Sequence, residues 1–250
     1  MQTLPCTFTA DNESSPAIGL IVLQSDETLE HELRQWLPKG YRLFHSRIPN
    51  SQQIDEQSLQ AMKARLPDSV SLLPENTRFT VIAYGCTSAS TLIGERAVTE
   101  AIQSVVGIDA LVTNPISAIK AQLQHIKAKK IALLTPYAPD ISAAMIANLE
   151  DSDYSIVHAG TFNETQDHRV ARISRDSLLS AIKQLGAHRD IDALVASCTN
   201  LRTYELLNEA STSIGCTVIS SNSALAWHIQ QLASGITDRD SGHRDSRAEG

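Results

Sequence analysis

Two cysteines, Cys86 and Cys198, each come directly after a short apolar run and are each followed by a threonine. The first stands in Val-Ile-Ala-Tyr-Gly-Cys-Thr and the second in Ala-Leu-Val-Ala-Ser-Cys-Thr, so a small residue precedes both. A thiol between the end of a buried strand and the start of a helix meets free backbone N–H groups and the positive end of the helix dipole, which favour the thiolate. The two segments therefore predict a pair of reactive cysteines.

The spacing of these segments indicates an internal repeat. The interval between Cys86 and Cys198 is almost the same as the interval between Ile18 and Ile131, where two other apolar runs start. A single cysteine after a strand is usually a small buried residue, but packing gives no reason for cysteine at equivalent points of two repeats. We therefore expect two similar lobes related by a pseudo-two-fold axis. The carboxyl ends of their strands, and with them both cysteines, would face one cleft.

Two reactions suit such a pair. One thiolate can remove the proton from a carbon beside a carboxylate while the opposite thiol returns a proton, which is racemisation without cofactor or metal. Alternatively, one thiolate adds to an activated double bond, and rotation and elimination give the geometric isomer. The hydroxyls of Thr87, Ser88 and Thr199 suit a carboxylate or enolate oxygen. The residues leave both routes open, and a third hypothesis is a non-catalytic two-lobed protein that binds small molecules.

The rest of the chain alternates short apolar runs with amphipathic segments, which is typical of parallel sheets covered by helices on both faces. The predicted fold class is therefore α/β, with two lobes and the active site between them. Strands are expected at 18–23, 41–46, 80–84, 110–113, 131–135, 154–159, 193–196 and 217–220. Helices are expected at 27–36, 55–66, 89–105, 116–126, 141–149, 174–185, 201–210 and 223–232.

This alternation also predicts the domain boundaries. Residues 17–114 together with 221–235 should form the first lobe, and residues 115–220 the second. Residues 1–16 are expected to be a flexible tail. The charged segment 236–250 has no periodicity and is expected to be a disordered tail.

Composition excludes several classes of function. The formal net charge is −7, aromatic residues make up 4% and no basic cluster occurs, which argues against a nucleic-acid partner. No apolar run approaches the length of a membrane span, and no secretory signal is visible, so we expect a cytoplasmic protein without a membrane partner. The remaining cysteines, Cys6 and Cys216, do not form metal-ligand spacings. No nucleotide or zinc-protease motif is present, so we expect neither cofactor nor metal.

The sequence resembles the Asp/Glu racemase superfamily, in the branch that contains maleate cis-trans isomerase and arylmalonate decarboxylase. The segments that carry the resemblance are 19–30, Tyr84-Gly-Cys-Thr-Ser88, Leu134-Thr-Pro-Tyr137, Ser197-Cys-Thr-Asn200 and 220–226. Members are two-lobed α/β enzymes without cofactors, and decarboxylase members keep only one of the two cysteines. The resemblance thus implies an isomerase or racemase, with Tyr137, Asn163 and Asn200 in the substrate site. We expect it to act on a small carboxylate or amino-acid-derived substrate as a homo-oligomer.

Asp26 departs from the pattern of this branch, in which the maleate isomerases place an asparagine that binds a substrate carboxylate. A carboxylate there repels another carboxylate. One interpretation is structural: Ser25 caps a helix and Asp26 lies in its first turn. The other is that Asp26 binds an ammonium or amide N–H group of the substrate. The Ser-Asp-Glu-Thr form at 25–28 also resembles the ectoine-utilisation racemase-like subgroup, which would imply a diaminobutyrate derivative as substrate.

Overall fold

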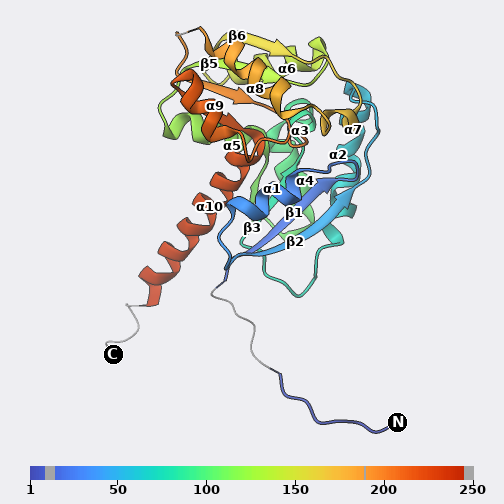
Figure 1. Ribbon diagram of the computed structural model, residues 1–250. Helices are drawn as coiled ribbons and strands as arrows, with labels where there is room; N and C mark the ends of the chain where they lie inside the picture. The colour runs from blue at the N-terminus through green and yellow to red at the C-terminus, as the bar shows by residue number, and fades with distance from the viewer. Residues whose placement is uncertain (9–14, 189, 245–250) are drawn as a thin grey trace.

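The computed structural model of the protein describes residues 1–8, 15–188 and 190–244. Over these residues the chain forms two lobes, each built on a four-stranded sheet (Figure 1). The strand order is β2-β1-β3-β4 in the first sheet and β6-β5-β7-β8 in the second, and every pairing is parallel. The second sheet thus repeats the order of the first. This confirms the predicted α/β class with two similar lobes.

The strands lie where the apolar runs predict them, with ends that differ by about two residues at most. They are β1 Ala17–Leu23, β2 Arg42–Ile48, β3 Val81–Gly85, β4 Leu111–Thr113, β5 Lys130–Thr135, β6 Ser155–Thr161, β7 Ala193–Ala196 and β8 Thr217–Ser220. Every residue of β1, β3 and β7 is buried. The side chains of a strand point alternately to the two faces of its sheet. Because helices cover both faces here, apolar side chains are needed at every position, which explains the continuous apolar runs.

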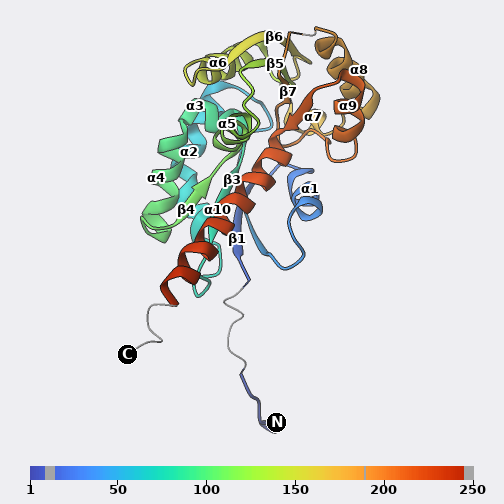
Figure 2. The same cartoon turned by 90° about the vertical axis from the view of Figure 1, so that its left-hand side faces the viewer.

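Helices cover both sheets (Figures 1 and 2). They are α1 Leu29–Trp36, α2 Glu56–Ser71, α3 Thr87–Ile93, α4 Glu95–Val106, α5 Pro115–His125, α6 Pro139–Glu150, α7 Asp167–Val170, α8 Arg175–Gly186, α9 Leu207–Ile214 and α10 Ser221–Arg244. None of the helices in the described part of the chain is long and apolar enough to cross a membrane.

The helix predicted at 89–105 is in fact two helices, α3 and α4. Gly94 lies between them with φ of 89°, a conformation that side-chain-bearing residues rarely adopt. Its N–H donates to the carbonyl of Ser90 and so ends α3, while its carbonyl accepts from Val98 and so starts α4. The break keeps α3 short and leaves Cys86 at its N-terminus.

The helix predicted at 201–210 begins only at Leu207, because N–H groups before it donate hydrogen bonds to a side chain of the first lobe. The buried carboxylate of Glu32, on α1 of the first lobe, accepts hydrogen bonds from the N–H groups of Thr203 and Tyr204 and from the Thr203 hydroxyl. The Asn222 amide donates to the same carboxylate. Residues 201–206 therefore form turns that join the lobes, and no helix follows Cys198 directly.

The last helix, α10, also joins the lobes. It starts directly after β8 of the second sheet and packs against α1, α5, β3 and β4, and Figure 2 shows it running along the first lobe. It continues to Arg244, so the disordered tail predicted from 236 is wrong for 236–244; once a helix has started, each further residue adds a hydrogen bond at little cost. Residues 245–250 lie outside the described residues. Residues 1–8 form no helix or strand and are exposed.

A third contact between the lobes is made by the segment between β2 and α2. Gln53 and Gln166 form an antiparallel bridge. The N–H of Ile54 donates to the carbonyl of Thr165 at 2.8 Å, and the N–H of Asp167 donates to the carbonyl of Gln52 at 3.1 Å. Residues 52–54 of the first lobe are therefore paired with the backbone that leads into α7 of the second.

Gly85, which precedes Cys86, has no room for a side chain. A Cβ there overlaps Cδ2 of Leu29 and lies 3.3 Å from the main-chain oxygen of Ile21. Leu29 is fully buried at the start of α1, so an added methyl group has to displace a side chain of the core. The close approach of β3 to α1 therefore requires glycine.

We expect Gly85→Ala to lower the free energy of unfolding by about 1–3 kcal/mol, because the added methyl group overpacks the core. Urea unfolding of the variant and the parent protein measures the loss. Gly40→Ala is the matched control, since a Cβ at Gly40 meets nothing within 4 Å. An equal loss in both variants would contradict this account.

Candidate active site

Cys86 lies where the sequence predicts it, between the end of β3 and the start of α3. It is the N-cap residue of α3, and its Sγ accepts a hydrogen bond from the N–H of Ala89 at 3.4 Å. The Ser88 hydroxyl lies 3.6 Å from the same sulfur. Cys86 is buried, with 3% of its surface exposed. The first cysteine therefore has the backbone and hydroxyl partners that stabilise a thiolate.

Cys198 has different surroundings from those predicted. It follows β7 after Ser197, but the next helix is α9, which begins nine residues later at Leu207. The prediction of a helix N-terminus at this cysteine is therefore wrong. Its Sγ accepts from the N–H of Asn200 at 3.4 Å instead, and the nearby Tyr137 hydroxyl lowers the pKa of the thiol. Each sulfur thus accepts one backbone N–H at the same distance, but only Cys86 is the N-cap residue of a helix.

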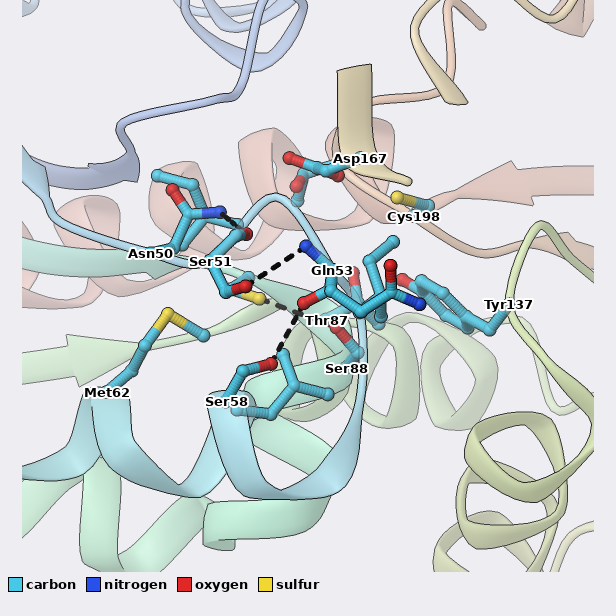
Figure 3. A pocket seen from close by; sticks show the side chains of 15 residues that line it. Asn50, Ser51, Gln53, Ser58, Met62, Thr87, Ser88, Tyr137, Asp167 and Cys198 are labelled. Atoms are coloured by element: carbon cyan, nitrogen blue, oxygen red, sulfur yellow. Dashed lines mark hydrogen bonds between the residues drawn. The ribbon is translucent and has the colours of Figure 1, made fainter. Parts of the chain in front are cut away.

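Both cysteines line the same cavity between the lobes (Figure 3). The remaining lining residues come from the β2–α2 segment and α2, from the strand ends and from the start of α7; they are Leu23, Asn50, Ser51, Gln53, Ile54, Ser58, Leu59, Met62, Thr87, Ser88, Tyr137, Asp167 and Thr199. The enclosed volume is about 20 Å³, roughly the space of one water molecule. A substrate therefore requires the lobes or the β2–α2 segment to move apart.

The two threonines of the Cys-Thr pairs line the cavity, and each bonds to a residue at the end of another strand. The Thr87 hydroxyl lies 2.9 Å from the hydroxyl of Ser221, at the start of α10. The Thr199 hydroxyl donates to the carbonyl of Gly85 at 3.4 Å. Each cysteine is therefore followed by a residue that ties its own strand end to the facing one.

Tyr137 is brought into the site and Asn163 is not. Tyr137 is buried after β5, lines the cavity and contacts Cys198. Asn163 is exposed, is not among the lining residues and has φ of 52°, a left-handed conformation that asparagine tolerates well in turns. Its N–H donates to the Thr161 hydroxyl. The structure therefore does not bring Asn163 to this cavity, and its predicted place in the substrate site stays a prediction.

Asn200 is buried beside the cavity but does not line it. Its side-chain oxygen accepts from the N–H of Glu27, and its amide donates to the main-chain carbonyl of Asp167. Its own carbonyl accepts from the Thr28 hydroxyl. With these partners, Asn200 fixes the turn before α1 against the second lobe rather than facing a ligand.

Asp26, and not Ser25, binds the backbone at the start of α1, whose N-cap residue is Thr28. Asp26 Oδ1 accepts hydrogen bonds from the N–H groups of Thr28 and Leu29, both at 2.8 Å. Ser25 instead donates its hydroxyl to the carboxylate of Asp167. The prediction that Ser25 caps the helix and Asp26 lies in its first turn is therefore wrong, although Asp26 does have a structural role at the start of α1.

The second oxygen of Asp26 is buried and accepts no hydrogen bond. Burial raises the pKa of Asp26 from 3.8 to about 6; the backbone donors of Leu29 and Thr28 lower the pKa, the charge of Asp167 raises it and the nearby Thr199 hydroxyl lowers it. Asp26 does not itself line the cavity, but it is close enough for its charge to raise the pKa values of both cysteines.

Asp167 is the site residue that the sequence analysis missed. It begins α7, is 4% exposed and lines the cavity. Burial raises the pKa of its carboxyl, and hydrogen bonds from Ser25 and Asn200 lower it. Asp167 stands in a polar stretch without periodicity, and only its long-range backbone pairing with Gln52 brings it to the site. No local signal marks it.

The thiols are less acidic than the sequence predicts. Burial raises the pKa of Cys86 to about 12, against the lowering effect of Ala89 and Ser88, and Asp167 and Asp26 raise it further. Burial also raises the pKa of Cys198, followed by the charge of Asp167. In the closed cavity both cysteines are therefore thiols, and the expected thiolate requires a change in the charge or solvation around them.

Known proteins show similarity over nearly all of the chain. A family model described as arylmalonate decarboxylase matches residues 18–244. A maleate isomerase from Nocardia farcinica is 28% identical over 223 residues, which are 85% of this chain and 88% of that protein. An arylmalonate decarboxylase from Bordetella bronchiseptica is 25% identical over 140 residues, which are 56% and 58% of the two chains.

A solved structure of the Nocardia farcinica maleate cis-trans isomerase has the same fold. It is a cysteine-to-serine mutant with a covalently bound succinylcysteine intermediate. The TM-score is 0.79 at 25% identity, and the match covers 88% of this chain and 93% of that one.

The raised pKa of Asp26 predicts a pH-dependent stability. Between its ordinary value of 3.8 and about 6, the unfolded chain releases this proton and the folded protein keeps it. Stability is therefore lost as the pH rises through this range. Asn at position 26 keeps the oxygen that binds the backbone at the start of α1 and has no proton to lose. Relative to the parent, Asp26→Asn should gain about 2 kcal/mol between about pH 4.5 and about pH 7.5.

Urea unfolding at the two pH values measures this difference. Asp109→Asn is the control, because Asp109 is exposed on the loop between α4 and β4. It should change stability by the same amount at both pH values. A pH-independent effect of Asp26→Asn would show that the Asp26 carboxyl is not held protonated by burial.

Proposed function

The chain belongs to the arylmalonate decarboxylase family, and we propose that it is a two-cysteine isomerase that moves a proton at the carbon beside the carboxylate of a small substrate. The resemblance noted in the sequence is confirmed at the level of this family, and the curated relatives are an isomerase and a decarboxylase, both enzymes. One observation carries the proposal: Cys86 from the first lobe and Cys198 from the second line a single enclosed cavity.

In the proposed racemisation, the thiolate of one cysteine takes the proton from the carbon beside the carboxylate. The electron pair of the broken C–H bond moves into the carboxylate, which becomes an enediolate. The thiol of the other cysteine then donates its proton to the opposite face of the carbon. The first cysteine ends as a thiol and the second as a thiolate, so the step needs no oxidant or reductant, and the reverse direction restores the starting state.

The hydroxyls around the cysteines support this chemistry. Ser88 and Tyr137 line the cavity with Cys86 and Cys198, and both side chains can donate to a carboxylate or enediolate oxygen. Such donors matter most when negative charge develops in a site that excludes water. Within the class of amino-acid-derived carboxylates, the form of residues 25–28 makes a diaminobutyrate derivative of ectoine breakdown the first substrate to assay.

The second candidate is cis-trans isomerisation of a maleate-like substrate. It is favoured by the 28% identity to the Nocardia farcinica maleate isomerase and by the succinylcysteine intermediate in the solved relative. In this route, one thiolate adds to the double bond, rotation follows about the new single bond and elimination returns the thiolate. Both routes use Cys86 and Cys198, and they differ in the product.

We expect the protein in deuterated water to racemise an amino-acid-derived carboxylate with incorporation of deuterium at the carbon beside the carboxylate. Cys86→Ser and Cys198→Ser should each lower the rate by about 100-fold or more, because each removes one partner of the proton transfer. Nuclear magnetic resonance follows exchange, and chiral chromatography follows racemisation. The panel contains 2-aminobutyrate, 2,4-diaminobutyrate, their N-acetyl derivatives and maleate.

Cys216→Ser is the control for cysteine replacement, since Cys216 lies at the start of β8 and is not among the residues that line the cavity. It should leave the rates unchanged. Fumarate formed from maleate, and lost in both active-site variants, would assign the second candidate instead. Full activity in either Cys86→Ser or Cys198→Ser contradicts a two-cysteine mechanism, and no turnover of any compound favours a binding protein.

A further inference from the structure

We propose that the carboxyl groups of Asp26 and Asp167 form a subsite for a positively charged ammonium group of the substrate, so that the enzyme acts on amino carboxylates and discriminates against dicarboxylates. This inference deepens the function proposed above and takes the identity of the reacting pair from it. It is carried by three independent features: the contacts of Asp167, an unpartnered oxygen on Asp26 and the charges of the cavity lining.

Asp167 is held as a hydrogen-bond acceptor that faces the cavity. The amide of Asn50 donates to the Ser25 hydroxyl at 2.7 Å, so the single proton of that hydroxyl is free to be donated to the Asp167 carboxylate. Figure 3 shows Asp167 beside Cys198 at the upper edge of the cavity. This chain of donors presents the carboxylate to a ligand with its orientation already set.

Asp26 supplies a second acceptor with nothing bound to it. The Asp26 side chain is 4% exposed. Its Oδ1 accepts hydrogen bonds from the N–H groups of Thr28 and Leu29, but its Oδ2 accepts none from the described residues. A buried carboxylate oxygen without a hydrogen bond is costly unless a partner is present for part of the functional cycle. The Thr199 hydroxyl lowers the pKa of the Asp26 carboxyl, which is within the range of charge interaction with Asp167 and both cysteines.

The lining residues contain no lysine, arginine or histidine to neutralise this charge. Two cations nearby are engaged elsewhere: Arg47 donates to the main-chain carbonyl of Asp26 and pairs with Glu30, and Arg172 pairs with Glu27. The charge of His168 acts on Asp167 from the next position in the chain, but His168 is exposed and does not line the cavity. Among the described residues, no three His, Cys, Asp or Glu side chains are arranged to hold a metal ion. An organic cation from the substrate is therefore the fitting partner.

The opposite part of the cavity suits a carboxylate. In Figure 3, Thr87 and Ser88 lie below Asp167, and their hydroxyls can donate to an anion. An amino carboxylate would place its ammonium against the two aspartates and its carboxylate against these hydroxyls. A dicarboxylate would bring its second carboxylate up to Asp167, where like charges repel in a desolvated site.

The same arrangement would couple binding to activation of the cysteines. Asp167 and Asp26 both raise the pKa values of Cys86 and Cys198, so a bound ammonium that cancels their charge lowers the barrier to thiolate formation. A ligand without a positive charge leaves both thiols protonated. Selection of the substrate and ionisation of the catalytic group would then depend on the same ion pair.

The test is the binding of four small carboxylates to the full chain by isothermal titration calorimetry. The probes are 2-aminobutyrate, 4-aminobutyrate, butyrate and succinate. At least one aminobutyrate should bind the parent protein about 10-fold or more tightly than butyrate, and succinate should bind most weakly. Asp167→Asn should lower this preference for the ammonium by about 10-fold or more and should raise the affinity for succinate.

Asp109→Asn removes the same charge from an exposed loop and should leave the parent order of affinities unchanged. If Asp167→Asn fails to fold by near-ultraviolet circular dichroism, Asp26→Asn gives the second measurement, because the asparagine keeps the oxygen that binds the backbone at the start of α1. The preference for the ammonium should fall in that variant too.

Succinate binding as tight as that of the aminobutyrates would overturn the subsite, as would the absence of aminobutyrate binding or an unchanged preference in both aspartate variants. These outcomes do not depend on whether the protein catalyses the proposed reaction. Proton exchange that requires both cysteines but ignores the ammonium would leave the reaction intact without the subsite. Binding that depends on the ammonium without any exchange would leave the subsite intact without the reaction.

Discussion

The buried carboxylate of Glu32 is the interaction on which the arrangement of the two lobes depends. It lies on α1 of the first lobe and collects two N–H groups, a hydroxyl and an amide from the second lobe and the start of α10. Burial raises the pKa of Glu32 and these donors lower it, so the group is stable inside the protein only while the lobes are closed on each other. Because Asp26 Oδ1 accepts from the N–H of Leu29, the first residue of α1, the same contact holds Asp26 near the turn that carries Cys198.

Closure of the two lobes both assembles the site and makes negative charge in it unfavourable. It brings two strand ends to one cavity, which a single lobe cannot do, and it removes water from the reacting atoms. Removing water also penalises every negative charge, so the cysteines are held as thiols and Asp26 titrates near pH 6. Because the proposed reaction uses thiolates, binding of the substrate has to offset this desolvation cost.

Features that depend on residues close together in the sequence are predictable from it, whereas hydrogen bonds between segments far apart in the chain are not. The strands were found because residues of sheets covered on both faces must be apolar throughout, and the Cys-Thr pairs were found because they recur at the same strand ends. Asp167 was missed because its position depends on backbone pairing with Gln52, far away in the sequence. The local sequence predicts Ser25 as the cap of α1 because nothing nearby marks its true partner, Asp167. It also predicts a helix soon after Cys198, because nothing nearby shows that Glu32 binds the N–H groups of Thr203 and Tyr204.

The path of α10 has a consequence for how the protein forms during synthesis. The second sheet is built from one continuous stretch of chain and is complete when β8 has left the ribosome. The first sheet has all its strands long before that, but the surface that receives Leu225, Ile229 and Ala233 stays uncovered until the last helix emerges. The nascent first lobe therefore carries an open apolar face while the rest of the protein is translated, which makes it the part that chaperones have most reason to bind.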